Sequence, residues 1–222
     1  MEPTVLAQSL ILADPSTVAD LRTFVGRARA ADDGAVRLQA NGTILAAYVC
    51  LLRPRLLGEG TPTVLGLRTM ALSEPAEADV TVPLAAVSDR LARMGERSTV
   101  LSLPPQELKE AWAGMSPPRG GWDRAGTLDG GVLLELARSG IAEVAAIIPD
   151  KPGALIVNNA RAAVWGRPID GLDPQVPAGA AFAAYALGFA VAGREIGVFR
   201  SARWTRLSGP GGHVLVRPAA VF

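Results

Sequence analysis

Apolar residues recur at helical spacing near the start of the chain. Between Asp14 and Gly34 they are separated by three and four positions, which predicts an amphipathic helix with one buried face: Val18, Leu21, Val25 and Ala28. Asp14 suits the N-cap of this helix and Pro15 suits its first turn. We expect the helix to follow a first strand over residues 5–12.

Alternation with a period of two replaces this pattern downstream. Residues 36–40 alternate between apolar and polar side chains, and residues 43–52 form a mostly apolar run. Asn41 and Gly42 stand between the two segments and predict a hairpin turn, because both residue types tolerate positive φ. The remaining pattern of the first half predicts strands over 63–72, 80–82 and 99–103, an acidic loop over 73–78, and a helix that begins at Pro83.

The second half follows a break at residues 116–121, which read Ser-Pro-Pro-Arg-Gly-Gly. We expect Thr127 to cap a helix, and we favour a helix over a strand for residues 154–165, where the pattern fits both. Residues 178–191 are almost wholly apolar and rich in small side chains, which predicts a buried packing element. Residues 198–217 alternate around a Gly-Pro-Gly-Gly turn at 209–212 and predict a terminal hairpin.

These elements predict an α+β fold. We expect a mixed, largely antiparallel N-terminal sheet with two helices, followed by a helical region and a C-terminal β-hairpin. The break predicts an α+β region over residues 1–115 and a helical region ending in the hairpin over 116–222; one continuous domain is the alternative. A chain of 222 residues is long enough to bury a substantial core in either arrangement.

Composition limits the cellular compartments and the classes of partner that the sequence favours. The formal net charge is +1, so the whole-molecule field does not favour nucleic acid or an anionic membrane. The single cysteine, Cys50, lies in an apolar run and excludes an intramolecular disulfide framework. The start of the chain lacks the pattern of a signal peptide, and no apolar run is long enough to span a bilayer. We therefore expect a cytoplasmic protein without a membrane partner.

Catalytic signatures are sparse. His213 is the only histidine, no serine lies in a Gly-x-Ser-x-Gly elbow, and neither of the common glycine-rich phosphate-binding motifs is present. We expect no catalytic residue, no cofactor and no metal site; by residue count, only an all-carboxylate site for Mg²⁺ or Ca²⁺ is left open. Asp129-Gly130-Gly131 near a predicted helix start fits either an anion-binding turn or a close packing contact.

Positive charge is concentrated at the C-terminal hairpin. Residues 194–217 contain five arginines and one acid, a local charge of +4. The candidate nucleic-acid-binding residues are Arg200, Arg203, Arg206 and His213, since guanidinium groups on a hairpin can contact phosphate. Strand alternation divides the arginines between two faces, with Arg200 and Arg206 on one and Arg203 on the other. The structural alternative is a terminal hairpin that closes a sheet, with Trp204 packed inside.

Three hypotheses for function follow. The first is a non-catalytic cytoplasmic protein that acts through protein–protein contacts and self-associates, because the small residues of 178–191 would permit close approach of another helix. The second is a nucleic-acid-binding protein that uses the arginine-rich hairpin. The third is a small-ligand binder or enzyme whose site is built from dispersed carboxylates and arginines and is not visible from spacing.

Overall fold

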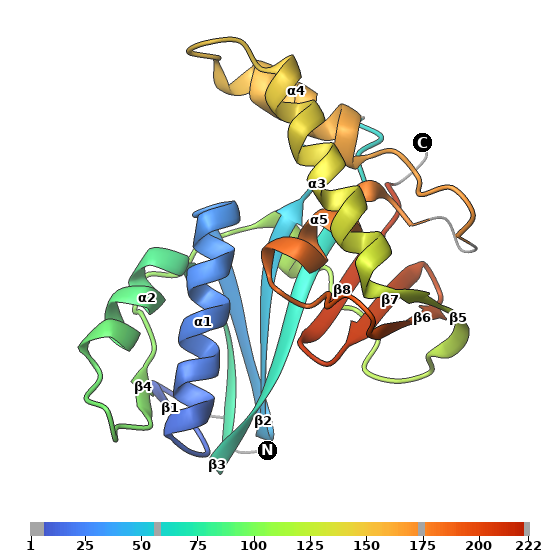
Figure 1. Ribbon diagram of the computed structural model, residues 1–222. Helices are drawn as coiled ribbons and strands as arrows, with labels where there is room; N and C mark the ends of the chain where they lie inside the picture. Colours follow the sequence, from blue (N-terminus) through green and yellow to red (C-terminus); the bar gives the residue numbers. More distant parts are fainter. Residues whose placement is uncertain (1–6, 56–58, 173–175, 220–222) are drawn as a thin grey trace. The chain divides into compact units, whose positions relative to one another are not determined.

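The computed structural model describes residues 7–55, 59–172 and 176–219 (Figure 1). It confirms an α+β fold with antiparallel strand pairs, five α-helices and C-terminal hairpin strands. The elements in chain order are β1 (Ser9–Ile11), α1 (Pro15–Ala31), β2 (Ala35–Leu52), β3 (Thr63–Pro83), α2 (Leu84–Arg93), β4 (Val100–Ser102), the 3₁₀ helix η1 (Ala111–Gly114), β5 (Asp123–Asp129), α3 (Gly130–Ile147), α4 (Ala154–Trp165), α5 (Ala178–Ala186), β6 (Glu195–Ser201), β7 (Trp204–Gly209) and β8 (Gly212–Arg217). Positions 5 and 6 of the expected first strand lie outside the described residues, and β1 lies within the remaining part of that segment.

The chain divides into two compact units. Unit 1 comprises residues 1–49 and 67–115, and unit 2 comprises residues 50–66 and 116–222. The end of β2 and the start of β3 therefore belong to unit 2, although they lie in the first half of the sequence. β1 pairs with β4, and the other strands follow the order β2-β3-β8-β7-β6-β5.

The first helix forms as its pattern predicts. The Asp14 carboxylate accepts hydrogen bonds from the Thr17 backbone N–H at 2.8 Å and the Ser16 hydroxyl at 2.6 Å. These donors stabilise the charged form and lower the pKa of Asp14, with the serine hydroxyl as the largest cause. The predicted apolar stripe is buried, with Phe24 beside it, and α1 contacts α2 within unit 1.

The predicted hairpin at Asn41-Gly42 is wrong, because β2 runs without a turn from Ala35 to Leu52. Gly42 does adopt a positive φ of 57°, but its N–H donates to the Glu77 carboxylate at 3.1 Å and the strand continues. The positive φ thus produces an irregularity within a long strand rather than a reversal. The predicted acidic loop at 73–78 is also wrong, since β3 is a single strand of 21 residues through this segment.

Unit 2 departs from the prediction at its first helix. Residues 123–129 form β5, so Thr127 lies in a strand, and Asp129 caps α3 by accepting from the Gly131 N–H at 2.7 Å. Residues 154–165 form α4, the helix that we favoured. The hairpin turn at 209–212 is confirmed by the pairing of Gly209 with Gly212. A second reversal at Ala202 and Arg203 divides the expected long strand into β6 and β7.

The small residues of α5 allow close packing within unit 2. The helix ends at Ala186, before the end of the apolar run, and its buried positions are Gly179, Ala180, Ala181, Ala183 and Ala184. A Cβ atom on Gly179 would lie 2.9 Å from the Leu52 side chain and 3.0 Å from the Trp165 carbonyl. The close approach that we predicted for this segment therefore occurs inside the chain. None of the helices formed by the described residues is long and apolar enough to cross a bilayer.

Candidate functional site

The structure separates the four candidate residues of the hairpin. Arg200 is exposed near the end of β6, and its cross-strand neighbour is Thr205. Arg203 is exposed in the β6–β7 turn and donates to the Ala219 carbonyl at 3.4 Å. Arg206 and His213 lie on the face of the β5–β8 strands opposite to that of Arg200, as the register shows. No single surface therefore collects all four residues.

Arg206 stacks on two aromatic rings. Its guanidinium carbon lies 4.5 Å from the ring centroid of Trp122 and 4.8 Å from that of Phe199. Its Nε atom is buried and has no hydrogen-bond partner among the described residues. Burial lowers the pKa of Arg206, because an apolar environment disfavours the charged form. These contacts give Arg206 a packing role as well as a charge.

His213 faces a serine across the hairpin. Its Nδ1 atom lies 2.9 Å from the Ser208 hydroxyl, and the two residues are register partners on β8 and β7. Both side chains are partly buried. This is the contact expected of neighbouring polar residues on an antiparallel pair. Within the described ranges, no group of three or more His, Cys, Asp or Glu side chains is placed to hold a metal ion.

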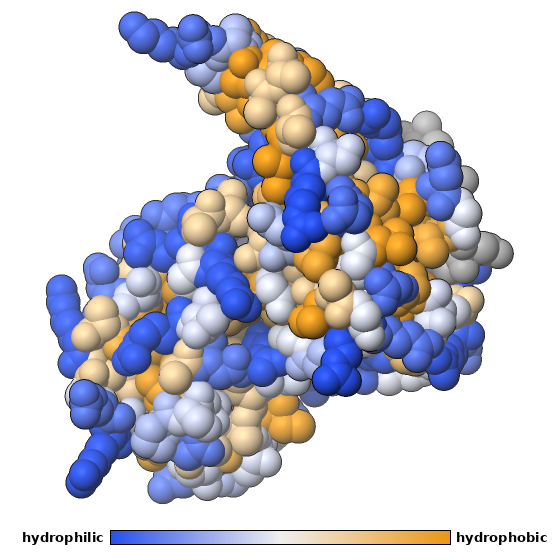
Figure 2. All heavy atoms as spheres, viewed as in Figure 1, coloured by the Kyte–Doolittle hydropathy of each residue, from blue (hydrophilic) through white to orange (hydrophobic). Residues whose placement is uncertain are grey.

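A second candidate surface lies on the helical hairpin of α3 and α4. The residues that α3 buries are Gly130, Leu133, Ala137 and Gly140, all in its first eleven positions. Beyond Gly140 the helix extends away from the strands of its unit together with the start of α4 (Figure 1). Large apolar side chains there remain exposed by 37–63%: Ile141, Ile147, Leu155 and Ile156. We call these four residues the hairpin tip surface, and Figure 2 shows hydrophobic atoms along this hairpin.

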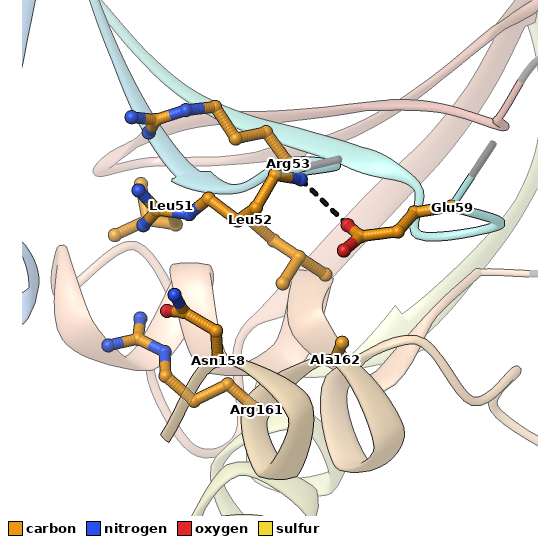
Figure 3. Close-up of a pocket in the computed structure, with 8 residues that line it drawn as sticks. Leu51, Leu52, Arg53, Glu59, Asn158, Arg161 and Ala162 are labelled. Atoms are coloured by element: carbon orange, nitrogen blue, oxygen red, sulfur yellow. Dashed lines mark hydrogen bonds between the residues drawn. The ribbon is translucent and has the colours of Figure 1, made fainter. Parts of the chain in front are cut away.

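A third candidate is a small pocket between the end of β2 and α4. Arg53, Arg55 and Glu59 line one side, and Asn158 and Arg161 of α4 line the other. Leu51, Leu52 and Ala162 complete the lining. Figure 3 shows Asn158 and Arg161 below the β2 end, with Glu59 opposite. We call this site the arginine pocket; all of its lining residues belong to unit 2.

Two fixed contacts position parts of the arginine pocket. The Arg55 backbone N–H donates to the Glu59 carboxylate at 2.7 Å. The Arg161 guanidinium lies 5.7 Å from the ring centroid of Phe182, which stacks on Trp165 with centroids 4.8 Å apart. A cation near an aromatic face is attracted to the ring quadrupole, so the Phe182 ring restrains Arg161 beside the pocket.

Sequence reasoning did not predict either of these two sites. Arg53 and Arg55 are near neighbours in the chain, but Arg161 is more than a hundred positions away and spacing cannot connect it to them. The hairpin tip surface left a clearer signal. Residues 141–148 include four large aliphatic side chains and one acid, which is more apolar than a solvent-exposed helix end requires.

Family models match the two halves of the chain separately. Residues 6–114 match the model described as Domain of unknown function (DUF8010). Residues 117–221 match the model described as Domain of unknown function (DUF8185). Comparison with curated protein sequences finds no match.

Solved structures of similar fold include DNA polymerase III β subunits, one of them described as a sliding clamp. A provisionally assigned DNA polymerase III β subunit from Eubacterium rectale is 9% identical, with a TM-score of 0.55 over 97% of this chain. The Caulobacter crescentus polymerase III β protein is 10% identical, with a TM-score of 0.51 over 96%. The Bartonella birtlesii DnaN sliding clamp is 14% identical, with a TM-score of 0.50 over 96%. This chain spans 66% of the length of each of these proteins. It therefore has a fold similar to that of DNA polymerase sliding clamps.

Proposed function

We propose that this protein is a non-catalytic binding protein that self-associates through the hairpin tip surface. The observation that carries the proposal is the exposure of Ile141, Ile147, Leu155 and Ile156 on two neighbouring helices. Contiguous apolar surface of this kind marks interaction sites in folded proteins. One similar solved structure, from Bartonella birtlesii, is described as a DnaN sliding clamp, although a shared fold does not by itself fix a function.

A second copy of this chain is the occupant that fits the tip surface. Within one hairpin, each of the two helices covers only one face of the other, and a further apolar face stays exposed. Two such hairpins together can bury these faces in the shared core of a four-helix bundle. The charges of the tip also permit self-contact. Glu143 forms an ion pair with Arg167, and Asp150 and Lys151 are adjacent at the turn, so these four residues sum to zero charge. Like-charge repulsion would therefore not separate two copies.

Light scattering coupled to size exclusion tests the proposal. We expect the wild-type chain to have the mass of an oligomer at micromolar concentration, and the double variant Ile147→Glu/Leu155→Glu to have the mass of a monomer. Burial of two carboxylates in an apolar interface would cost several kcal/mol, while the exposed positions tolerate glutamate in the free chain. Circular dichroism would show unchanged helix content in the variant.

Val132→Glu is the matched control. Val132 lies at the other end of α3 and is 52% exposed, so the change is similar but outside the tip surface. We expect this variant to remain oligomeric. A wild-type chain that stays monomeric across the concentration range would refute self-association. If the wild-type chain is monomeric and the double variant is less thermally stable than the wild type, another part of the same chain covers the tip surface.

Nucleic-acid binding by the C-terminal hairpin is the second candidate function. The excess positive charge of residues 194–217 and the similarity of the fold to a DNA polymerase III sliding clamp support it. Arg200 and Arg203 are the exposed members of the candidate set, and we retain Arg206 and His213 as residues of the same hairpin. Replacement of Arg206 would also disturb the Trp122 and Phe199 contacts, so the test uses the exposed pair.

The salt dependence of DNA binding tests this candidate. If Arg200 and Arg203 each neutralise a phosphate, the Arg200→Gln/Arg203→Gln variant should make the negative slope of log K against log[salt] shallower by about 1.8. Fluorescence anisotropy with labelled duplex DNA at several salt concentrations gives the slope. Arg93→Gln/Arg97→Gln, which changes two exposed arginines in and after α2, should leave the slope unchanged. Absence of wild-type binding at low salt, or an equal loss in both variants, would eliminate the candidate.

A further inference from the structure

We propose that the arginine pocket binds a phosphate group. Three arginines and one asparagine, from two segments that are distant in sequence, are among the residues that line it: Arg53, Arg55, Arg161 and Asn158. Guanidinium groups present planar pairs of N–H donors that match two oxygens of a phosphate. The Asn158 amide can supply a further donor. The site needs no residue of the tip surface or of the C-terminal hairpin.

The charge of the lining matches a phosphate monoester. Three arginines and Glu59 give the pocket a net charge of +2, and a phosphate monoester carries about −1.5 to −2 at pH 7. A carboxylate would neutralise only half of this charge. The Glu59 carboxylate accepts a hydrogen bond from the Arg55 backbone N–H at 2.7 Å. Both residues belong to the connection between β2 and β3.

The size and surroundings of the pocket restrict how the phosphate binds. The cavity is about 20 Å³, room for about one water molecule. The enclosed part therefore accepts phosphate oxygens, while the ester substituent or the remaining oxygens lie at the mouth. The buried side chains of Leu51 and Leu52 lower the local polarity, which strengthens the attraction between guanidinium and phosphate. The Phe182 ring restrains Arg161 before the ligand arrives, which reduces the entropic cost of binding.

Isothermal titration with inorganic phosphate, in buffers held at constant ionic strength with potassium chloride, tests the proposal. We expect saturable phosphate binding by the wild-type chain and about tenfold weaker binding by Arg161→Gln, which is the loss of one charge-assisted hydrogen bond. A parallel titration with phenyl phosphate identifies the source of the phosphate. Tighter binding of the ester would indicate a phosphoryl group carried by a larger ligand, and equal binding would indicate the free ion.

Arg138→Gln is the matched control, since Arg138 is an exposed arginine on α3 that pairs with Glu135 outside the pocket. Its phosphate affinity should equal that of the wild-type chain. If Arg161→Gln fails to fold because the Phe182 contact is lost, Arg53→Gln provides the same test from the other side of the pocket. Absence of wild-type phosphate binding, or an equal loss in the pocket variant and the control, would overturn the proposal. Neither result bears on self-association, which is measured by mass.

Discussion

Replacement of Gly130 by alanine is expected to destabilise the protein by about 3 kcal/mol, the upper part of the usual range for overpacking. A Cβ atom on Gly130 would clash with the Val191 carbonyl oxygen and would lie 2.9 Å from the Val191 nitrogen. Both atoms belong to the backbone, which cannot move aside as a flexible side chain can. The Gly130 N–H also donates to the Arg194 carbonyl at 2.8 Å, so displacement of the helix start would strain a hydrogen bond. Chemical denaturation followed by circular dichroism measures the change.

Gly26→Ala is the control for this prediction and should have the opposite sign. Gly26 lies within α1, and apart from its chain neighbours and the backbone of its own helix, no described residue has a heavy atom within 4 Å of a Cβ placed there. Alanine is a better helix former than glycine by about 0.5–1 kcal/mol, so the variant should be more stable. An unchanged denaturation midpoint for Gly130→Ala would show that the start of α3 does not pack on Val191.

The glycines at 130 and 131 illustrate a limit of sequence analysis. From the sequence, Asp129-Gly130-Gly131 fitted an anion-binding turn and a packing contact equally well. The structure favours packing, because Gly130 approaches the backbone of Val191, a residue about sixty positions further along the chain. The Asp129 carboxylate occupies the space beside Gly131 as the helix cap. The residue that Gly130 contacts distinguishes the two interpretations, and this residue, Val191, lies outside the local sequence.

The same limit explains the wrong hairpin at Asn41-Gly42. The residue types predicted a positive φ correctly, and Gly42 adopts one. Whether the chain then reverses depends on the neighbouring strand. Here β3 is long enough to accompany β2 past this point, and the Glu77 carboxylate binds the Gly42 N–H. Local signals such as the Asp14 cap succeeded where donor and acceptor lie within one turn.

The candidate sites show a related division. Local charge density indicated the C-terminal hairpin as a candidate site. The turn at Ala202 and Arg203 was not predicted, and this turn changes which arginines share a face of the strands. The arginine pocket depends on contact between the end of β2 and α4, so no spacing rule could predict it. The apolar pattern likewise identified segments that favour burial, but it did not show which part of the structure would cover them. The apolar α5 is buried inside its own unit, whereas the distal α3–α4 hairpin stays exposed.

Trp165 and Gly140 should behave as a coupled pair in a double-mutant cycle. Trp165 is 2% exposed and stacks on Phe182, so Trp165→Ala is expected to cost about 3–5 kcal/mol. Gly140→Ala should cost about 1–3 kcal/mol, because its Cβ would lie 2.5 Å from the Trp165 ring atom Cη2. In the double variant the new methyl group enters space that the indole has vacated. We therefore expect the two costs to sum to more than the measured loss.

The expected coupling is about 1–3 kcal/mol, measured as the non-additivity of unfolding free energies from chemical denaturation. Strictly additive losses would show that the indole does not pack on Gly140. The cycle also tests where the packed part of the helical hairpin ends, because Gly140 is the last residue that α3 buries along its described length. If this contact anchors the base of the hairpin, Gly140→Ala should lower stability while the mass at a concentration well above the dissociation constant stays that of the wild-type oligomer. Ile147→Glu/Leu155→Glu should do the reverse, since its residues lie beyond the anchor and contact solvent in the single chain.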